Sequence, residues 1–241
     1  MSALLSLNGV SKRFRGLVAV DGVSFDLPEG VIFAVIGPNG AGKTTLFSMI
    51  AGAMKPDSGA ITFAGAPIGG LTPDAVCRRG IARTFQLVRP FPALSVADNV
   101  IVGALLRERH VDAARERALA VLRRLDLFDK RNQIASTLTL PDRKRLEVAR
   151  ALATEPKLLL LDEVMAGLRP TETDRMVATL REINRDSGLT ILLIEHVMRA
   201  VMALASHVLV LDHGVAIASG APETVVRDPA VVQSYLGVEA V

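Results

Sequence analysis

The chain has 241 residues, 50% of them hydrophobic, so it can bury a sizeable core and is not a small stapled scaffold. Its 28 basic and 25 acidic residues give a net charge of only +3, which gives no indication of a nucleic-acid partner. One cysteine, Cys77, excludes a disulfide within the chain and suits a reducing compartment. We expect neither a signal peptide nor a membrane span, because the first residues lack a cationic segment and no apolar run approaches roughly 18 residues.

The first part of the chain reads as strands that surround one helix. Alternating polar and apolar residues predict half-buried strands over 5–10 and 23–27. An apolar strand over 31–36 leads through a glycine-rich loop into a helix over 43–51, which Gly52 ends. We then expect a strand over 60–63, a short helix after Thr72 and Pro73, and a strand over 81–85.

From residue 90 to about residue 153 the pattern becomes helical. Ser95 caps an apolar segment that runs to Leu106, and a third helix starts near Pro141. One face of the helix between them carries Ala114, Ala118, Val121, Leu122 and Leu125. This block has no strand candidate, so we interpret it as a helical subdomain inserted between two halves of a sheet.

The remainder returns to alternating strands and helices. We expect strands over 157–161 and 190–194, helices over 171–186 and up to Ala205, and two short strands within 208–219. Uninterrupted apolar strands are typical of a parallel sheet that is covered on both faces. The sequence therefore predicts an α/β fold.

The residues that follow the strand over 31–36 carry the main chemical signal. They read Gly37, Pro38, Asn39, Gly40, Ala41, Gly42, Lys43, Thr44, Thr45 and match GxxxxGK[ST], the phosphate-binding loop. Glycines let successive N–H groups face one anion, and the helix N-terminus adds a partial positive charge. Lys43 can then reach the β- and γ-phosphates, and the Thr44 hydroxyl can ligate Mg²⁺. The alternative is a glycine turn that only joins strand to helix. The motif in this context predicts binding of a nucleoside triphosphate.

A second signal is the acidic pair Asp162 and Glu163, which ends the strand over 157–161. Ligands of α/β proteins bind at the carboxyl edge of the sheet, where these side chains belong. Asp162 can hold the same Mg²⁺ as Thr44, and Glu163 can polarise a water in line with the γ-phosphate. Alone, such a pair is often only solvated; together with the loop it predicts hydrolysis.

In these motifs the chain resembles the ATP-binding subunits of ABC transporters, over essentially its full length. Gln86 matches the glutamine loop, which senses Mg²⁺ and the attacking water, and His196 matches the switch histidine at the γ-phosphate. Phe14 stands where the family usually has a tyrosine that stacks on adenine, although it could also be a core residue. The residues over 166–169 match the D-loop.

The resemblance implies the ABC ATPase fold in a single domain over 1–241. This fold has a RecA-like core, here over 1–87 and 153–241, with an antiparallel β portion near the N-terminus. The helical subdomain would cover 88–152. The cofactors implied are ATP and Mg²⁺.

More closely, the chain resembles the ATPase subunits of branched-chain amino acid importers. Short sequence segments typical of this group occur over 11–14, 19–25, 84–86 and 194–196, and at the ending Tyr235-Leu236-Gly237. Uptake of urea or another small amide or amino acid is the neighbouring alternative. The resemblance does not identify the transported solute.

One motif departs from the family. The signature usually written LSGGQ reads here Leu138, Thr139, Leu140, Pro141, Asp142. In the family this segment clamps the ATP that is held by the partner subunit's loop. Thr139 can supply a hydroxyl, but Pro141 has no N–H to donate, although proline at a first helical position preserves the helix and its dipole. Arg143 and Lys144 could substitute as charges or could form a solvated basic face.

The implied partners are two membrane permease subunits, a second ATPase subunit and, indirectly, a solute-binding protein, but no nucleic acid. The second ATPase subunit is expected to be a different chain, with a homodimer as the alternative. The implied location is cytoplasmic, against the inner face of the cell membrane. Two other classes stay open: a regulatory ABC subunit with little turnover, and a soluble ABC protein acting on ribosomes or DNA.

Overall fold

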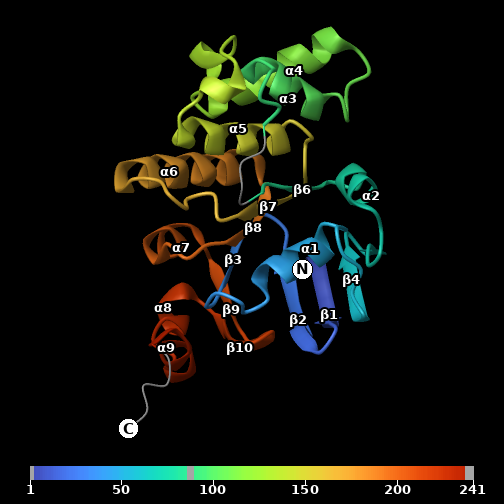
Figure 1. The fold of residues 1–241 in the computed structure, drawn as a ribbon, viewed down its shortest axis with the longest axis vertical. Coiled ribbons are helices and arrows are strands. Elements are labelled where there is room, and N and C mark those ends of the chain that lie inside the picture. The colour runs from blue at the N-terminus through green and yellow to red at the C-terminus, as the bar shows by residue number, and fades with distance from the viewer. Residues whose placement is uncertain (1–2, 86–89, 237–241) are drawn as a thin grey trace.

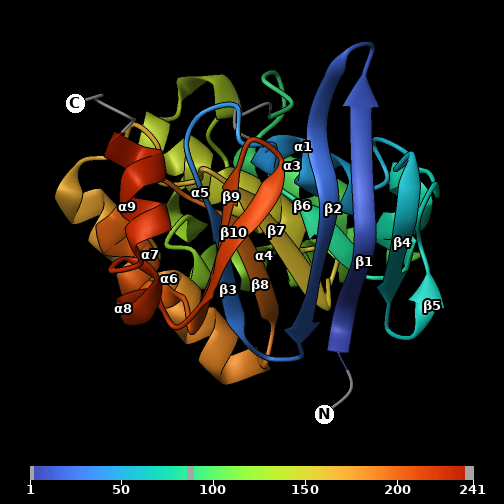
Figure 2. The same cartoon turned by 90° about the horizontal axis from the view of Figure 1, so that it is seen from below.

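The computed structural model describes residues 3–85 and 90–236. Over these residues the chain folds into a larger and a smaller β-sheet with helices packed around them, as two perpendicular views show (Figure 1; Figure 2). This arrangement confirms the predicted α/β class. The predicted bounds of a helical subdomain, 88–152, stay a prediction.

The larger sheet contains the predicted parallel strands and one antiparallel strand. In chain order these are β3 (Ile32–Ile36), β6 (Ile81–Arg83), β7 (Leu158–Asp162), β8 (Thr190–Ile194), β9 (His207–Asp212) and β10 (Val215–Gly220). They lie in the order β10-β9-β3-β8-β7-β6, and β10 is the antiparallel member of this order. The parallel pairing brings the carboxyl ends of β3, β7 and β8 to one edge, which is where an α/β protein binds its ligand.

The smaller sheet confirms the antiparallel portion near the N-terminus. Its strands are β1 (Ala3–Phe14), β2 (Leu17–Pro28), β4 (Ser58–Phe63) and β5 (Ala66–Pro67), in the order β2-β1-β4-β5. The hairpin of β1 and β2 is longer than the alternation predicts, because pairing continues to Phe14 and Leu17 at its tip. Arg15 makes the turn there with a positive φ of 52°. The hairpin thus places Phe14 beside its exposed tip.

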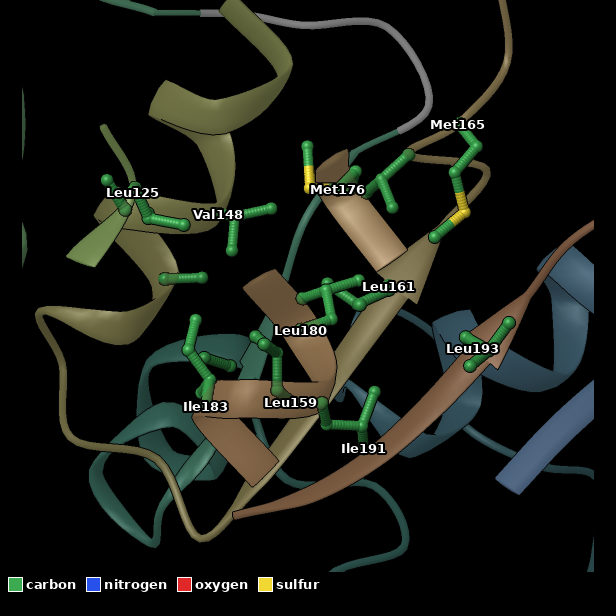
Figure 3. Packing of buried hydrophobic residues seen from close by; sticks show 14 of the residues in the cluster. Leu125, Val148, Leu159, Leu161, Met165, Met176, Leu180, Ile183, Ile191 and Leu193 are labelled. Carbon is green, nitrogen blue, oxygen red and sulfur yellow. The ribbon is translucent and has the colours of Figure 1, made fainter. Parts of the chain in front are cut away.

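Helices cover both faces of the larger sheet. Alternate side chains of β7 and β8 point to opposite faces, so each strand contributes to two apolar clusters. On one face, α6 (Pro170–Ser187) packs its apolar side against the strands; Figure 3 shows Leu180 and Ile183 of this helix beside Leu159, Leu161 and Ile191. On the other face, α1 (Lys43–Ile50) buries Leu46, Phe47 and Ile50 in the cluster that holds Leu158, Leu160, Leu192 and Ile194. Burial on both faces explains the unbroken apolar strands.

The helical block forms as the sequence predicts. It contains α3 (Val96–Ala104), α4 (Val111–Arg124) and α5 (Leu140–Leu152), with short 3₁₀ turns η1 (Phe128–Lys130) and η2 (Ala135–Thr137) between α4 and α5. Ser95 caps α3 by accepting the Asp98 N–H at 3.0 Å. Val148 of α5 belongs to the same apolar cluster as Leu161 of the sheet (Figure 3), so the block packs on the sheet through α5.

The remaining helices border the core. They are α2 (Pro73–Arg78), α7 (Met198–Leu204), α8 (Pro222–Val225) and α9 (Pro229–Leu236). Among the described residues, no helix combines the length and the apolar character that crossing a membrane requires.

Candidate functional site

The glycine-rich loop connects β3 to α1 and is clamped between neighbouring strands. Gly37 has a φ of 146°, and a Cβ there would lie 2.0 Å from the Leu211 carbonyl oxygen at the end of β9. Gly42 has a φ of 98°, and its Cβ would lie 2.2 Å from the Ala19 carbonyl oxygen of β2. Both positions therefore require glycine for space as well as for backbone conformation. The clamped loop presents the N-terminus of α1, whose first N–H groups have no acceptor within the helix.

A cavity of about 390 Å³ opens in front of this loop. The loop and the start of α1 line it from Asn39 to Thr45, and the tip of the β1–β2 hairpin lines it with Phe14 and residues 17–19. Glu163 and His213 complete the lining. The fold thus brings Phe14, the glycine-rich loop and Glu163 around one cavity, although these elements lie far apart in the sequence.

Lys43 lies beneath the arch of the loop. Its side chain is buried, and its Nζ donates to the carbonyl oxygens of Gly37 at 2.7 Å and Pro38 at 2.8 Å. Burial lowers the pKa of Lys43, while the nearby carboxylates of Glu163 and Asp162 oppose this shift. The ammonium group is therefore held between the loop and the acidic pair.

Asp162 ends β7 and is almost fully buried. Its Oδ2 accepts a hydrogen bond from Arg83 Nη2 at 2.8 Å, and Arg83 Nη1 also reaches Ser48 Oγ of α1 at 3.1 Å. Within the described residues, Asp162 Oδ1 has no hydrogen-bond partner. Arg83 thus fixes the carboxylate next to α1 and leaves one oxygen for another ligand. Arg83 was not predicted from the sequence, where the available signal is a cation at the end of an apolar strand.

Glu163 and His196 follow the adjacent parallel strands β7 and β8. The Glu163 N–H donates to the Ile194 carbonyl oxygen at 2.9 Å, so the chain leaving β7 stays beside β8. Glu163 Oε1 lies 3.9 Å from His196 Nδ1, and 56% of the His196 side chain is exposed. The two predicted residues are therefore neighbours at the sheet edge that faces the cavity.

Gln86 lies outside the described residues, so its predicted role stays a prediction. The strand expected over 81–85 is shorter in the structure, because β6 ends at Arg83. The Thr84 N–H still donates to the Leu160 carbonyl oxygen at 2.9 Å, whereas the Phe85 side chain is 55% exposed.

The signature segment lies at the start of α5 and does not line the cavity in front of the loop. Thr139 is the N-cap residue, Leu140 is exposed, and the helix begins at Leu140. Pro141 therefore occupies the second helical position, not the first as expected. The consequence is unchanged, because the N–H of the second position also has no acceptor within the helix.

The side chain of Asp142, the last residue of the signature, is held by hydrogen bonds from its own chain. It is buried, and its carboxylate accepts hydrogen bonds from Thr139 Oγ1 at 2.8 Å, from Arg145 Nη2 at 2.8 Å and from Lys130. Burial alone would raise the pKa of Asp142, but the hydrogen bonds from Lys130 and Thr139 outweigh it and lower the pKa. The hydroxyl that the resemblance assigns to a partner's ATP thus already has a partner within its own chain.

Of the two alternatives for Arg143 and Lys144, a solvated basic face is wrong for Lys144, and substitution as charges stays a prediction. Arg143 is half-buried and donates to the carbonyl oxygens of Leu138 at 2.8 Å and Ser136 at 3.0 Å. Lys144 is only 4% exposed, and its Nζ donates to the Glu163 carbonyl oxygen at 3.0 Å. The helical period explains the difference, since position 144 lies one turn before the buried Val148.

A comparison with known proteins identifies the family. A family model described as ABC transporter matches residues 20–166. A second model, described as Branched-chain amino acid ATP-binding cassette transporter, matches residues 217–241. The first match covers more than half of the chain and includes the loop and the acidic pair.

Individual relatives match the chain nearly end to end. The high-affinity branched-chain amino acid transport ATP-binding protein LivG of Salmonella typhimurium is 40% identical over 249 residues, which cover 97% of this chain and 98% of LivG. The corresponding protein BraF of Pseudomonas aeruginosa is 36% identical over 252 residues, with 97% and 98% covered. A crystal structure of the ADP conformation of MJ1267, an ATP-binding cassette of an ABC transporter, has a TM-score of 0.89 at 30% identity and covers 98% of this chain and 100% of that chain. The chain therefore belongs to the ABC transporter family, as an ATP-binding subunit with ATPase activity.

Proposed function

We propose that this chain hydrolyses ATP to power an importer of branched-chain amino acids. The observation that carries the proposal is the likeness to LivG, 40% identical over 97% of this chain. The family model for branched-chain amino acid cassettes, which matches residues 217–241, supports the same substrate class. The arrangement of Lys43, Asp162 and Glu163 around one edge of the sheet supports hydrolysis as well as binding.

We propose that ATP occupies the cavity in front of the glycine-rich loop. The N–H groups between Asn39 and Thr45 would hold the β- and γ-phosphates, and Lys43 would turn from the loop carbonyls toward them. Phe14 would stack on adenine at the hairpin tip, since its ring is 41% exposed and lines the cavity.

Replacing Phe14 with alanine is expected to raise the dissociation constant for ATP by about 3- to 30-fold, because one stacking interaction worth about 1 to 2 kcal/mol is lost. Calorimetric titration of the full chain measures this change. Phe14→Tyr is the matched control and should bind ATP normally, because the aromatic face is kept. Phe14 would instead be a structural residue if Phe14→Ala unfolded the protein but left the affinity of the folded fraction unchanged.

The donors around Asp162 fit a hydrated Mg²⁺ ion. A buried carboxylate oxygen without a hydrogen-bond partner in the described chain, Asp162 Oδ1, is a suitable ligand, and Thr44, at the start of α1, lines the cavity in front of the loop. Mg²⁺ is bound in such sites through few protein groups together with water and phosphate oxygens. When bound, it would neutralise charge on the β- and γ-phosphates. Gln86 is proposed as a further contact of the ion.

Glu163 is proposed to orient the attacking water, and His196 to contact the γ-phosphate. The 3.9 Å between Glu163 Oε1 and His196 Nδ1 supports a shared role at one phosphate. Glu163 would accept hydrogen bonds from the water, which needs no covalent step by the protein. Catalysis in this proposal is positioning and charge stabilisation.

The altered signature supports a pairing with a different ATPase subunit. In this chain the Thr139 hydroxyl bonds to Asp142, Pro141 has no N–H, and the Asp142 carboxylate is negative. Such a segment would hold a partner's triphosphate weakly. We propose that this chain's own loop meets the intact signature of another subunit and forms the productive site, while the second site turns over slowly.

The face between the core and the helical block is proposed to meet the membrane permeases. A cavity of about 320 Å³ lies there, lined by Ala51 and Ala53 just after α1 and by residues of α2, β6, α3 and α5. Phe85 and Val102 in its lining are 55% and 46% exposed. An exposed apolar surface of this kind is typical of a contact with another protein. This contact would place the chain on the inner face of the cell membrane.

The test is to express this chain with the proteins encoded beside it and to isolate the complex in lipid. We expect two permease subunits and a second ATPase subunit to copurify, and we expect ATPase activity to rise when leucine-loaded binding protein is added. Stimulation by urea-loaded binding protein alone would assign the neighbouring substrate class. Cosedimentation with ribosomes in place of permeases would contradict the proposal.

A further inference from the structure

The turn that follows β7 has an unusual backbone. Glu163 has a φ of 50°, in the left-handed region that residues with side chains seldom adopt. Such a conformation persists only where the surrounding structure holds it. The Glu163 N–H is held by the Ile194 carbonyl oxygen, and the rest of the turn is held by two side chains to which the proposed function assigns no role.

Lys144 of α5 holds the carbonyl end of Glu163. Its Nζ donates to that carbonyl oxygen at 3.0 Å, and the side chain is only 4% exposed. A lysine is rarely buried to this degree unless it has partners. Burial lowers the pKa of Lys144, while the carboxylates of Glu195 and Glu163 favour its charged form.

Glu195 holds the next part of the turn. It follows β8 directly, is 1% exposed, and its Oε1 accepts the Met165 N–H at 2.8 Å. Within the described chain its Oε2 has no hydrogen-bond partner. Burial raises the pKa of Glu195 to about 7, and the Lys144 cation opposes this shift. A carboxyl group at this depth, immediately before His196, ties the His196 segment to the turn that contains Glu163.

We propose that Lys144 and Glu195 are positioning residues that hold the turn over 163–165, so that the Glu163 carboxylate and His196 face the same phosphate. This inference rests on the proposed role of Glu163. The Lys144 hydrogen bond also connects the signature with the Glu163 turn of the same chain, because Lys144 lies on α5, the helix that begins with the signature. When that end of α5 engages the nucleotide of the partner subunit, Lys144 carries any shift of the helix to the Glu163 turn of its own chain.

The test uses the reconstituted complex and compares turnover with ATP affinity. Lys144→Met keeps the length of the side chain but removes its charge and donor. We expect kcat to fall by about 10- to 100-fold, as for a small misplacement of a catalytic group, with the ATP dissociation constant unchanged within about 2-fold. Lys144→Arg should restore part of kcat, since it keeps a cationic donor. Lys157→Met, at an exposed position before β7, is the matched control and should behave as the wild type.

Glu195 is tested by two variants of similar size. Glu195→Gln keeps an oxygen that can accept the Met165 N–H and should retain most of kcat, whereas Glu195→Leu should lose about 10-fold or more. Thermal unfolding of each full chain identifies any variant that fails to fold. In that case the folded Lys144→Arg and Glu195→Gln variants test the proposal. A kcat below one tenth of the wild-type value in both of them would overturn it.

A double variant separates this inference from the proposed function. Because Lys144 acts through Glu163, Lys144→Met added to Glu163→Gln should lower turnover little further. An unchanged kcat in Lys144→Met, or an additive loss in the double variant, would overturn the inference alone. Normal turnover in Glu163→Gln itself would overturn the proposed role of Glu163 instead.

Discussion

Replacing Glu163 with glutamine is expected to lower ATP turnover in the reconstituted complex by about 100-fold or more. The amide keeps the size of the side chain but cannot orient a water as strongly as a carboxylate. ATP affinity should remain close to the wild-type value, because Lys43, the loop and Asp162 are untouched. Phosphate release measures turnover, and calorimetric titration of the full chain measures binding.

The matched control is Glu29→Gln in an exposed turn, which should leave both quantities unchanged. Near-normal turnover in Glu163→Gln would assign the attacking water to another group. A large loss of ATP affinity would show that Glu163 serves binding rather than hydrolysis.

Replacing Lys43 with alanine is expected to weaken ATP binding itself. A charge-assisted contact with phosphate is worth roughly 1.5 to 3 kcal/mol, which corresponds to about a 10- to 100-fold higher dissociation constant. The buried ammonium group also donates to the carbonyl oxygens of Gly37 and Pro38, so the loop loses an internal support. Calorimetric titration at fixed ionic strength gives the affinity, and thermal unfolding shows whether the chain still folds.

Lys157→Ala removes an exposed lysine of the same charge and should bind ATP normally. An affinity in Lys43→Ala equal to that of the wild type would contradict the role assigned to the loop lysine.

Much of the fold could be predicted because its signals are local. The unbroken apolar runs of β7 and β8 follow from burial on both faces, and the helix start at Lys43 follows from the spacing of the loop. The length of the β1–β2 hairpin could not be predicted. The two strands stay paired up to Phe14, beyond the residues in which polar and apolar side chains alternate. The early end of β6 at Arg83 likewise depends on its neighbours in the sheet.

The part of the candidate site that lies within one short sequence motif, the glycine-rich loop, could be predicted. The loop lies beside Glu163 because β3, β8 and β7 are adjacent and parallel, which the order of elements alone does not determine. Arg83, Lys144 and Glu195 were missed for one physical reason: a charged residue in a sequence reads as solvated unless its partner is known. Two of the three stand at the end of an apolar strand, as Asp162 does, and that position was the available signal.

Lys144 shows why charge alone misleads. It lies within the basic run over 143–145, which reads as a surface face of α5. Periodicity indicates otherwise, since Lys144 lies one helical turn before the buried Val148 and on the same face of α5. The altered signature gives a second example, because its sequence does not show that the Asp142 carboxylate accepts the hydrogen bond of the Thr139 hydroxyl.

In the proposed function, the loop, Asp162 and Glu163 of this chain form the productive ATP site. The most direct test places the glutamate-to-glutamine change separately in each ATPase subunit of the reconstituted transporter and measures ATP turnover at saturating ATP. We expect a much larger loss from Glu163→Gln in this chain than from the equivalent change in the other subunit. Equal losses from both subunits, or a larger loss from the other one, would contradict it.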